Sequence, residues 1–168
     1  MNTDWRTIVW QQFGAAIDML DDAIRHCLDR LWTAVLWQDT DDVQYGHMWF
    51  VAYHTLLWLD LFLTGSAEGF APPAPFMHGA LPETPYTQDQ ILQYLAQCRT
   101  KCQSTIAALT DETAQQRCVF EWMELSFLEL QLYSMRHVQE HAAQVSLVLG
   151  QHDVEGLDWV VTARDTAA

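Results

Sequence analysis

Apolar residues recur at helical spacing in the first part of the chain. Over about residues 4–27 they step by four and three positions, which places them on one face of a helix. They are Phe13, Ile17, Leu20, Ile24 and Cys27. A second helix, about Tyr45 to Thr64, is apolar nearly all round, and Gly65 is well placed to end it. We expect this second helix to be heavily buried, with some of the burial against a second subunit.

Capping boxes mark the start of two further helices. Residues 87–109 open with Thr-x-x-Gln, and residues 126–150 open with Ser-x-x-Glu before a long apolar pattern. No internal repeat and no second domain is visible in the 168 residues. Four long helices joined by connections of different length predict an all-α fold, a four-helix bundle forming one domain over residues 1–168.

Two connections are interpreted as irregular. Residues 28–42 predict a mixed segment that packs Trp32, Val35 and Trp37 onto the bundle and ends, in the sequence QDTDD, with a helix cap. Residues 110–118, TDETAQQRC, predict a polar turn.

The proline-rich stretch from 65 to 86 has no helical period. A connection of this length is usually a functional cover or a disordered linker. Three aromatic residues favour an ordered segment packed on the bundle: Phe70, Phe76 and Tyr86. The C-terminal segment around residues 156–164 predicts a short helix or extended piece that docks through Trp159.

The charge balance excludes several partners. The chain has 22 acidic and 8 basic residues, a formal net charge of −14, and no basic patch. Such a surface repels nucleic acid and anionic membranes, although its simplest effect is solubility. His54 and Asp60 interrupt the longest apolar run, so we do not expect it to span a membrane. The N-terminus does not look like a signal peptide, and a cytoplasmic location is expected.

The four cysteines are expected to be structural and reduced. Cys27, Cys98, Cys102 and Cys118 form no CxxC pair, and two of them share an apolar helix face. A zinc site built on that pair would need further ligands, and none is evident on the same helix. Reduced thiols also suit a cytosolic protein.

Three histidines are the candidate metal ligands. His137 and His141 are four residues apart and lie one turn apart on one helix face. His54 is a polar interruption deep in an apolar helix. Zinc, nickel and iron accept neutral imidazole, and three histidines leave coordination positions open, as in catalytic sites. The competing interpretation is three separate core or surface histidines, which is the commoner outcome for an isolated HxxxH.

Neighbouring positions strengthen the metal hypothesis. Tyr133 and Gln144 fall on the same stripe as the histidine pair, and Gln144 is a candidate hydrogen-bond partner for a ligand. His47 shares the face of His54 but lies about 10 Å along the axis, so we expect it at the rim. Three other histidines have no such context: His26, His78 and His152.

Two other metal sites fit less well. The sequence HVQEH also matches the HxxEH of inverted zinc peptidases, with Glu140 as general base. Those enzymes need an acidic ligand well downstream, and the one glutamate that follows, Glu155, is close by. Helical di-iron sites need Glu-x-x-His pairs. The residues three before the histidines are instead Val51, Ser134 and Val138.

The same residues carry a resemblance to a known family. The mid-helix histidine in AYHTLLWLDL, the following EGFAPPAPF and the stretch YSMRHVQEHAAQVSLVLGQ resemble the DinB-like (YfiT-like) superfamily of proposed metalloenzymes. The likeness in layout covers nearly the whole chain, and HxxxHxxQ on the last long helix is its most specific motif. One departure is mild: Ala142 and Ala143 precede Gln144 where a glycine is usual.

The resemblance implies an up-down-down-up bundle, often dimeric, that binds a divalent metal through His54, His137 and His141. Members of that superfamily include thiol S-transferases that use low-molecular-weight thiols such as bacillithiol. They also include mycothiol-dependent maleylpyruvate isomerases and a domain of ergothioneine-synthesising enzymes. One scaffold hosts several chemistries, so the likeness does not supply the reaction. A carboxylate-bearing thiol would need a basic clamp. Arg136 lies off the ligand stripe, and we expect it to pair with an acid such as Asp60 or Glu140.

Three functions remain open at this point. The first is a metal-dependent enzyme that transfers a low-molecular-weight thiol to, or hydrolyses, a small electrophilic substrate, assisted by Tyr133, Glu140 or Gln144. The second is a non-catalytic metal-binding or stress-related protein in which the metal braces the bundle. The third is a helical interaction module whose tryptophans form a dimer or partner surface.

Overall fold

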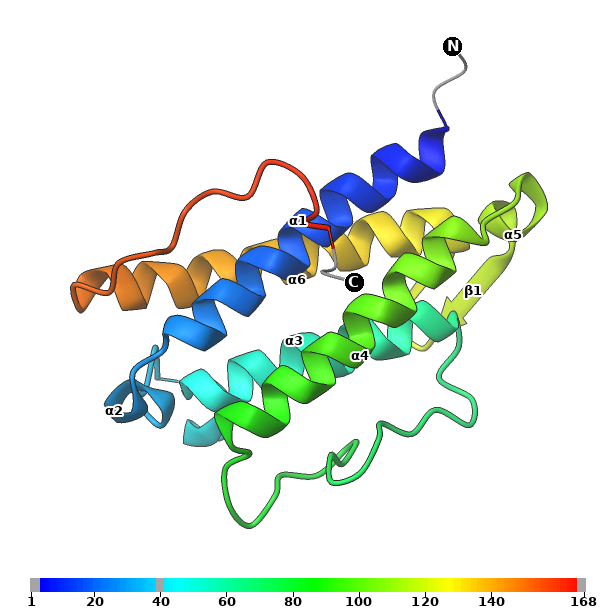
Figure 1. Ribbon diagram of the computed structural model, residues 1–168. Coiled ribbons are helices and arrows are strands. Elements are labelled where there is room, and N and C mark those ends of the chain that lie inside the picture. The colour runs from blue at the N-terminus through cyan, green and yellow to red at the C-terminus, as the bar shows by residue number, and fades with distance from the viewer. Residues whose placement is uncertain (1–3, 39–40, 166–168) are drawn as a thin grey trace.

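The computed structural model describes residues 4–38 and 41–165, and this part of the chain is mostly helical (Figure 1). Four helices are long: α1 (Trp5–His26), α3 (Met48–Thr64), α4 (Gln88–Ala107) and α6 (Phe127–Gln151). Shorter elements are α2 (Asp29–Trp32), a 3₁₀ helix (Val43–Gly46), α5 (Asp111–Gln115) and the strands β1 (Arg117–Phe120) and β2 (Met123–Ser126). The predicted all-α four-helix bundle is confirmed.

The course of the chain explains the long connection after α3. In Figure 1, α3 and α4 run in the same direction, while α1 and α6 run the opposite way, so the order is up-down-down-up. Around the bundle each long helix contacts two others, with α1 diagonal to α3 and α4 diagonal to α6. Because α3 and α4 are parallel neighbours, residues 65–86 must return along the bundle, about 25 Å for the 17 residues of α3.

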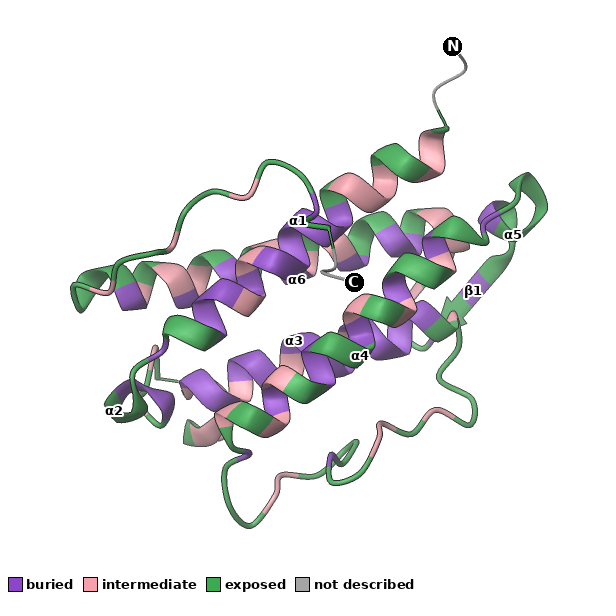
Figure 2. Ribbon diagram, viewed as in Figure 1, coloured by how far each residue is buried: buried purple, intermediate pink, exposed green. Residues whose placement is uncertain are grey.

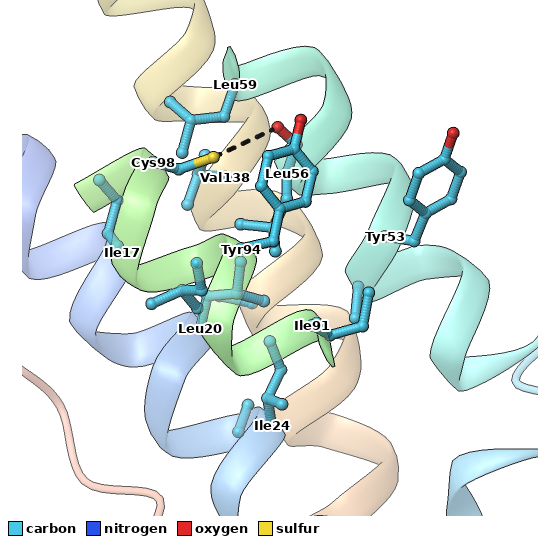
Figure 3. Close-up of a cluster of buried hydrophobic side chains, with 14 of the residues drawn as sticks. Ile17, Leu20, Ile24, Tyr53, Leu56, Leu59, Ile91, Tyr94, Cys98 and Val138 are labelled. Atoms are coloured by element: carbon cyan, nitrogen blue, oxygen red, sulfur yellow. Dashed lines mark hydrogen bonds between the residues drawn. The ribbon is translucent and has the colours of Figure 1, made fainter. Parts of the chain in front are cut away.

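The core lies where the four long helices face one another, as the buried faces in Figure 2 show. Figure 3 shows Ile17 and Leu20 of α1, Leu56 of α3 and Cys98 of α4 in one cluster of buried side chains. The thiol of Cys98 donates a weak hydrogen bond to the carbonyl of Leu56. All four cysteines are free and buried, as expected for core residues.

The chain itself buries α3 on nearly every side. Thirteen of its 17 residues are buried within a single copy of the protein. Its neighbours are α4, α6 and the 3₁₀ helix. Burial of α3 therefore does not require a second subunit, and the homodimer stays a prediction.

Both predicted capping boxes are present. Thr87 accepts from the backbone N–H of Gln90, and Ser126 accepts from that of Glu129, with the return bonds also formed. Gly65 ends α3 in the left-handed conformation at φ 76°, as expected for a helix C-terminus.

The 65–86 segment is ordered against the bundle, as its aromatics predicted. Phe76 and Tyr86 are buried, and the phenol of Tyr86 accepts a hydrogen bond from the backbone N–H of Met77. The indole of Trp32 donates to the carbonyl of Tyr86. The ring of Phe76 stacks on Tyr53 of α3 and on Tyr94 of α4, so the connection lies along both helices (Figure 1).

Three local predictions were incomplete or wrong. The polar turn after α4 is helix α5 followed by a two-stranded antiparallel hairpin, in which Phe120 pairs with Met123. Val35 is half exposed because it forms only an isolated bridge with His47, so its expected packing was wrong. Trp37 is also partly exposed, whereas Trp32 is buried as expected. The loop 38–42 ends at Asp42, which caps the 3₁₀ helix; residues 39 and 40 lie outside the described residues.

The C-terminal segment docks differently from the expectation. Trp159 is 71% exposed, so docking through this residue was wrong. The segment instead returns along α1, where Arg164 pairs with Asp22 and its backbone N–H donates to Asp18. Ala163 is buried close to Gly14, where a side chain would collide with it.

The expected ion pair of Arg136 with an acid such as Asp60 or Glu140 was also wrong, since neither pair forms among the described residues. Asp60 is buried between α3 and α4, where it pairs with Lys101 and accepts from the phenol of Tyr94. Arg136 is exposed on α6. Across residues 4–38 and 41–165, no helix combines the length and the apolar character needed to cross a membrane.

Candidate metal centre

Two neighbouring helices bring the three predicted histidines together. His54 is in the middle of α3, and His137 and His141 are one turn apart on α6. Nε2 of His137 lies 3.2 Å from Nε2 of His54 and 3.1 Å from Nε2 of His141. One nitrogen of each ring lies within 4.8 Å of the others. The structure therefore has a single point on which three imidazole nitrogens converge.

This spacing fits one metal ion. Zinc bonds imidazole nitrogen at about 2.0–2.1 Å, and tetrahedral geometry then separates two ligand nitrogens by about 3.3 Å. The observed separations of 3.1 and 3.2 Å are close to that value. Three nitrogen lone pairs cannot face one another at this distance without a cation or a shared proton between them. The donor set suits zinc, nickel or iron.

Burial keeps His54 and His137 in the form that binds metal. Burial, and then the nearby His141, lower the pKa of His54 to about 4. Burial, followed by His141 and His54, lowers the pKa of His137 to about 3. Both rings are therefore neutral near pH 7, and a neutral imidazole offers a lone pair to a metal.

Gln144 fixes the orientation of His141. Its side-chain Oε1 lies 2.7 Å from Nδ1 of His141 and can only accept, so this Nδ1 carries the proton. The lone pair of His141 is then on Nε2, which faces the other two histidines. This is the outer hydrogen bond usual for metal-bound histidine, and it lies where the sequence predicted it.

Trp58 holds His54 in the opposite tautomer. Its indole Nε1–H lies 3.2 Å from Nδ1 of His54, and an indole N–H can only donate. Nδ1 of His54 is therefore the acceptor, and its proton is on Nε2, directed at His137. Metal binding through Nε2 requires this proton to leave Nε2, so the contact with Trp58 must change.

His137 has a different environment on its outer side. Its Nδ1 is buried with no hydrogen-bond partner among the described residues, and the same holds for Oγ of Ser134. Ser134 is three residues earlier on the same helix. It is thus the candidate acceptor for the Nδ1 proton that His137 carries when Nε2 binds a metal.

Two cavities reach the histidines from different sides. The larger has a volume of about 580 Å³ and includes His54 and His141 in its wall. The smaller, of about 420 Å³, includes His54 and His137. Trp58, like His54, belongs to both walls. The site is therefore accessible to small molecules.

The other candidate residues differ in whether they line the cavities beside the histidines. Tyr133 lines the smaller cavity and packs edge-on against Phe62, with ring centroids 5.6 Å apart. Glu140 is exposed on α6 and lines neither of these two cavities. His47 is the N-terminal cap residue of α3, away from the cluster, as expected for a rim position. His78 lines the larger cavity.

Sequence reasoning missed Trp58 and the aromatic wall of the larger cavity. Trp58 follows His54 by four residues, so helical spacing alone would have placed it on the same face. Tyr45 and Phe50 are near His54 in the sequence. Trp37 and residues 78–81 come from separate connections. Helix periodicity gives no information on how such connections return to a site.

Fold and site together define the class: a four-helix bundle with a three-histidine centre between its second and fourth long helices. Comparison with family models matches residues 35–145 to the DinB superfamily, and the chain belongs to this family. The matched range contains His54, His137 and His141. A search of curated proteins and a search of solved structures returned no match.

Proposed function

We propose that this protein is a metal-dependent enzyme in which His54, His137 and His141 hold one divalent ion. The reaction is attack on a small electrophilic substrate, with water or a low-molecular-weight thiol as nucleophile. A bound divalent ion would lower the pKa of its water to about 7 or hold a thiolate ready for attack. The convergence of three imidazole nitrogens carries this proposal.

Access to the histidines supports catalysis over a purely structural metal. A structural site is closed by four protein ligands, whereas three histidines leave a position free. Two cavities each include two of the three histidines in their walls. A metal that only braced the bundle would need neither cavity.

The surrounding side chains have separable roles. Gln144 orients His141 through the Nδ1 hydrogen bond. Tyr133 places a phenol in the smaller cavity, where its hydroxyl can hydrogen-bond a molecule that approaches from that side. A catalytic role for Glu140 stays a prediction, since its exposed position supplies no contact that supports it.

Elemental analysis of protein purified without chelator tests the metal site. We expect about one zinc, nickel or iron per chain in the wild type and in His47→Ala, and less than about a tenth of that in His137→Ala. His47→Ala is the matched control, because His47 is on the same helix as His54 but outside the cluster. Metal retained in His137→Ala, or lost equally in both variants, would contradict the assignment.

Chelation distinguishes an enzyme from a metal-braced protein. The apolar core between the four helices is independent of the histidines, so we expect the metal-free protein to stay folded by circular dichroism. Activity toward electrophilic esters or thiol acceptors should then disappear on chelation and return with metal. Unfolding on chelation, with no activity in the loaded protein, would favour the non-catalytic alternative.

A further inference from the structure

The larger cavity has a wall without formal charge. Among the described residues that line it there is no aspartate, glutamate, lysine or arginine. Its volume of about 580 Å³ is in the range of small-molecule sites, roughly 300–1,000 Å³. On a protein with a net charge of −14, a neutral pocket beside the candidate centre is an informative exception.

Aromatic rings supply most of the surface that a ligand would touch. Tyr45 and Phe50 have ring centroids 4.8 Å apart, and Phe50 lies 5.9 Å from the ring of His54. Trp37 and Trp58 also belong to the wall. Flat apolar molecules pack favourably on such surfaces by offset or edge contacts.

Two of the polar side chains in this wall already donate hydrogen bonds within the protein. The phenol of Tyr53 donates to the carbonyl of Met77, and the indole of Trp58 donates to His54. The histidine end of the cavity, formed by His54 and His141, is where a reactive polar group would be received. The apolar body would lie against Phe50 and Leu57.

Without a bound metal ion, this cavity would bind a carboxylate or a phosphate poorly. Removing an anion from water is costly unless a cation or several N–H donors replace its hydration, and no lysine or arginine is in the described wall. The smaller cavity has a similar wall, with Phe62, Trp122 and Tyr133. Neither space has a basic clamp for an anionic thiol cofactor.

We infer that the larger cavity binds an uncharged molecule with a flat apolar body, whose polar reactive group faces His54 and His141. This inference rests on the proposed function for the identity of the reacting end. The ligand class itself depends only on the cavity wall, so it can be tested separately from the metal.

Three probes that share one ring system and differ in charge provide the test. They are naphthalene-1-carboxamide, which is neutral, 1-naphthoate, an anion, and 1-naphthylmethylammonium, a cation. Calorimetric titration should use metal-free protein, so that carboxylate binding to a metal does not interfere, and should be repeated with zinc-loaded protein. We expect the carboxamide to bind metal-free protein at least about tenfold more tightly than either ion. This ratio corresponds to about 1.4 kcal/mol of desolvation free energy that no interaction in the cavity offsets.

Ala80 allows the probe to be located. Ala80 belongs to the 65–86 connection and lines the cavity. Because its side chain is exposed, Ala80→Arg adds a cation at the rim with little risk to folding. We expect Ala80→Arg to improve naphthoate binding several-fold relative to the carboxamide. Ala80→Gln, a long uncharged side chain, is the matched control and should leave the preference unchanged.

The outcomes separate the two proposals. Tightest binding of naphthoate or of the ammonium probe, or no binding of the carboxamide below about 1 mM, would overturn the inferred ligand class. An unchanged preference in Ala80→Arg would overturn its placement in this cavity. Carboxamide binding by a protein that takes up no zinc would leave the ligand class standing and refute the proposed enzyme.

Discussion

A single hydrogen bond gives His141 the tautomer that a metal requires. The carboxamide oxygen of Gln144 accepts from Nδ1 at 2.7 Å and leaves Nε2 free. Outer hydrogen bonds of this kind usually change metal affinity by about 10- to 100-fold. We therefore expect Gln144→Leu to weaken zinc binding by about that factor, measured by competition with a chelating dye.

Gln139→Leu is the control for that measurement. Gln139 is on the same helix, and among the described residues its amide hydrogen-bonds only to the sulfur of Met19, which is a weak acceptor. We expect its zinc affinity to stay within about twofold of the wild type. Equal losses in the two variants would mean that helix α6 had been perturbed and would remove the role assigned to Gln144.

Trp58 opposes the tautomer that His54 needs for metal binding. Its indole N–H stabilises the lone pair on Nδ1, which keeps the proton on Nε2. Loss of a hydrogen bond typically costs about 0.5–1.5 kcal/mol. Trp58→Phe removes this cost from metal binding, so we expect zinc to bind about three- to tenfold more tightly.

The control for this prediction is Trp122→Phe. Trp122 lines the same smaller cavity and packs edge-on against Trp58 at 5.4 Å without forming the bond to His54. Its zinc dissociation constant should not change appreciably in the same competition assay. Weaker zinc binding in Trp58→Phe would show that the indole supports the site.

At the scale of elements, helix α6 depends on its cap. Ser126 accepts from the backbone N–H of Glu129, while the carboxylate of Glu129 accepts from the backbone N–H of Ser126. Substituting such a cap by alanine costs about 1 kcal/mol. Ser126→Ala should lower the free energy of unfolding by about this amount in urea titrations.

Ser104→Ala tests whether that loss comes from the cap. Ser104 is exposed inside α4, where alanine is a better helix former than serine. Its stability should be equal to or slightly above that of the wild type. A similar loss in both variants would show that the capping box contributes little.

The helices could be predicted because their signals are local. The spacing of apolar residues and the two capping boxes gave α1, α3, α4 and α6 with small errors at the ends. The hairpin was missed because its two-residue loop, Glu121 and Trp122, lacks the Asn-Gly or Asp-Gly signal of tight turns. Docking of the C-terminal segment was wrong because Arg164 pairs with aspartates about 140 positions earlier, a contact that no local pattern contains.

The site was predictable to a similar extent. His137, His141 and Gln144 share one helix, so their spacing was sufficient to group them. Joining them to His54 relied on a polar residue in an apolar helix, and the structure brings it within hydrogen-bonding distance of His137. The cavity wall depends on connections that pass over α3, and these follow from the topology of the whole chain.

At the scale of the whole molecule, buried histidines make stability depend on pH. In the unfolded chain a histidine has a pKa near 6.5, whereas in the folded protein His54 and His137 have values of about 4 and about 3. Between these values the unfolded state binds more protons. Their contribution to stability is therefore fully present above about pH 6.5 and is lost as the pH falls through the folded values.

We expect the metal-free protein to lose a few kcal/mol of stability between about pH 6.5 and about pH 4, since each pKa unit is worth about 1.4 kcal/mol. Urea unfolding at a series of pH values, with chelator present, measures this. The double variant His54→Gln/His137→Gln should show a clearly shallower dependence, and His47→Gln/His152→Gln should follow the wild type. Parallel curves for all three proteins would refute the assignment.

The parallel course of α3 and α4 also shapes the molecule. The 65–86 connection that this course requires brings residues 78–81 over the outer face of α3, where they complete the larger cavity. The connection that joins the two parallel helices thus also forms part of the cavity wall beside the histidines. An account of ligand choice has to include this connection as well as the helices.

The buried thiols decide which nucleophile an electrophile assay would detect. Burial raises the pKa of Cys27 to about 11, and it also raises the pKa of Cys98, Cys102 and Cys118. These side chains stay protonated at neutral pH and react slowly with alkylating reagents. Intact-mass spectra of the folded protein should therefore show little alkylation of its own cysteines. Consumption of the electrophilic reagent can then be attributed to an added thiol or to water.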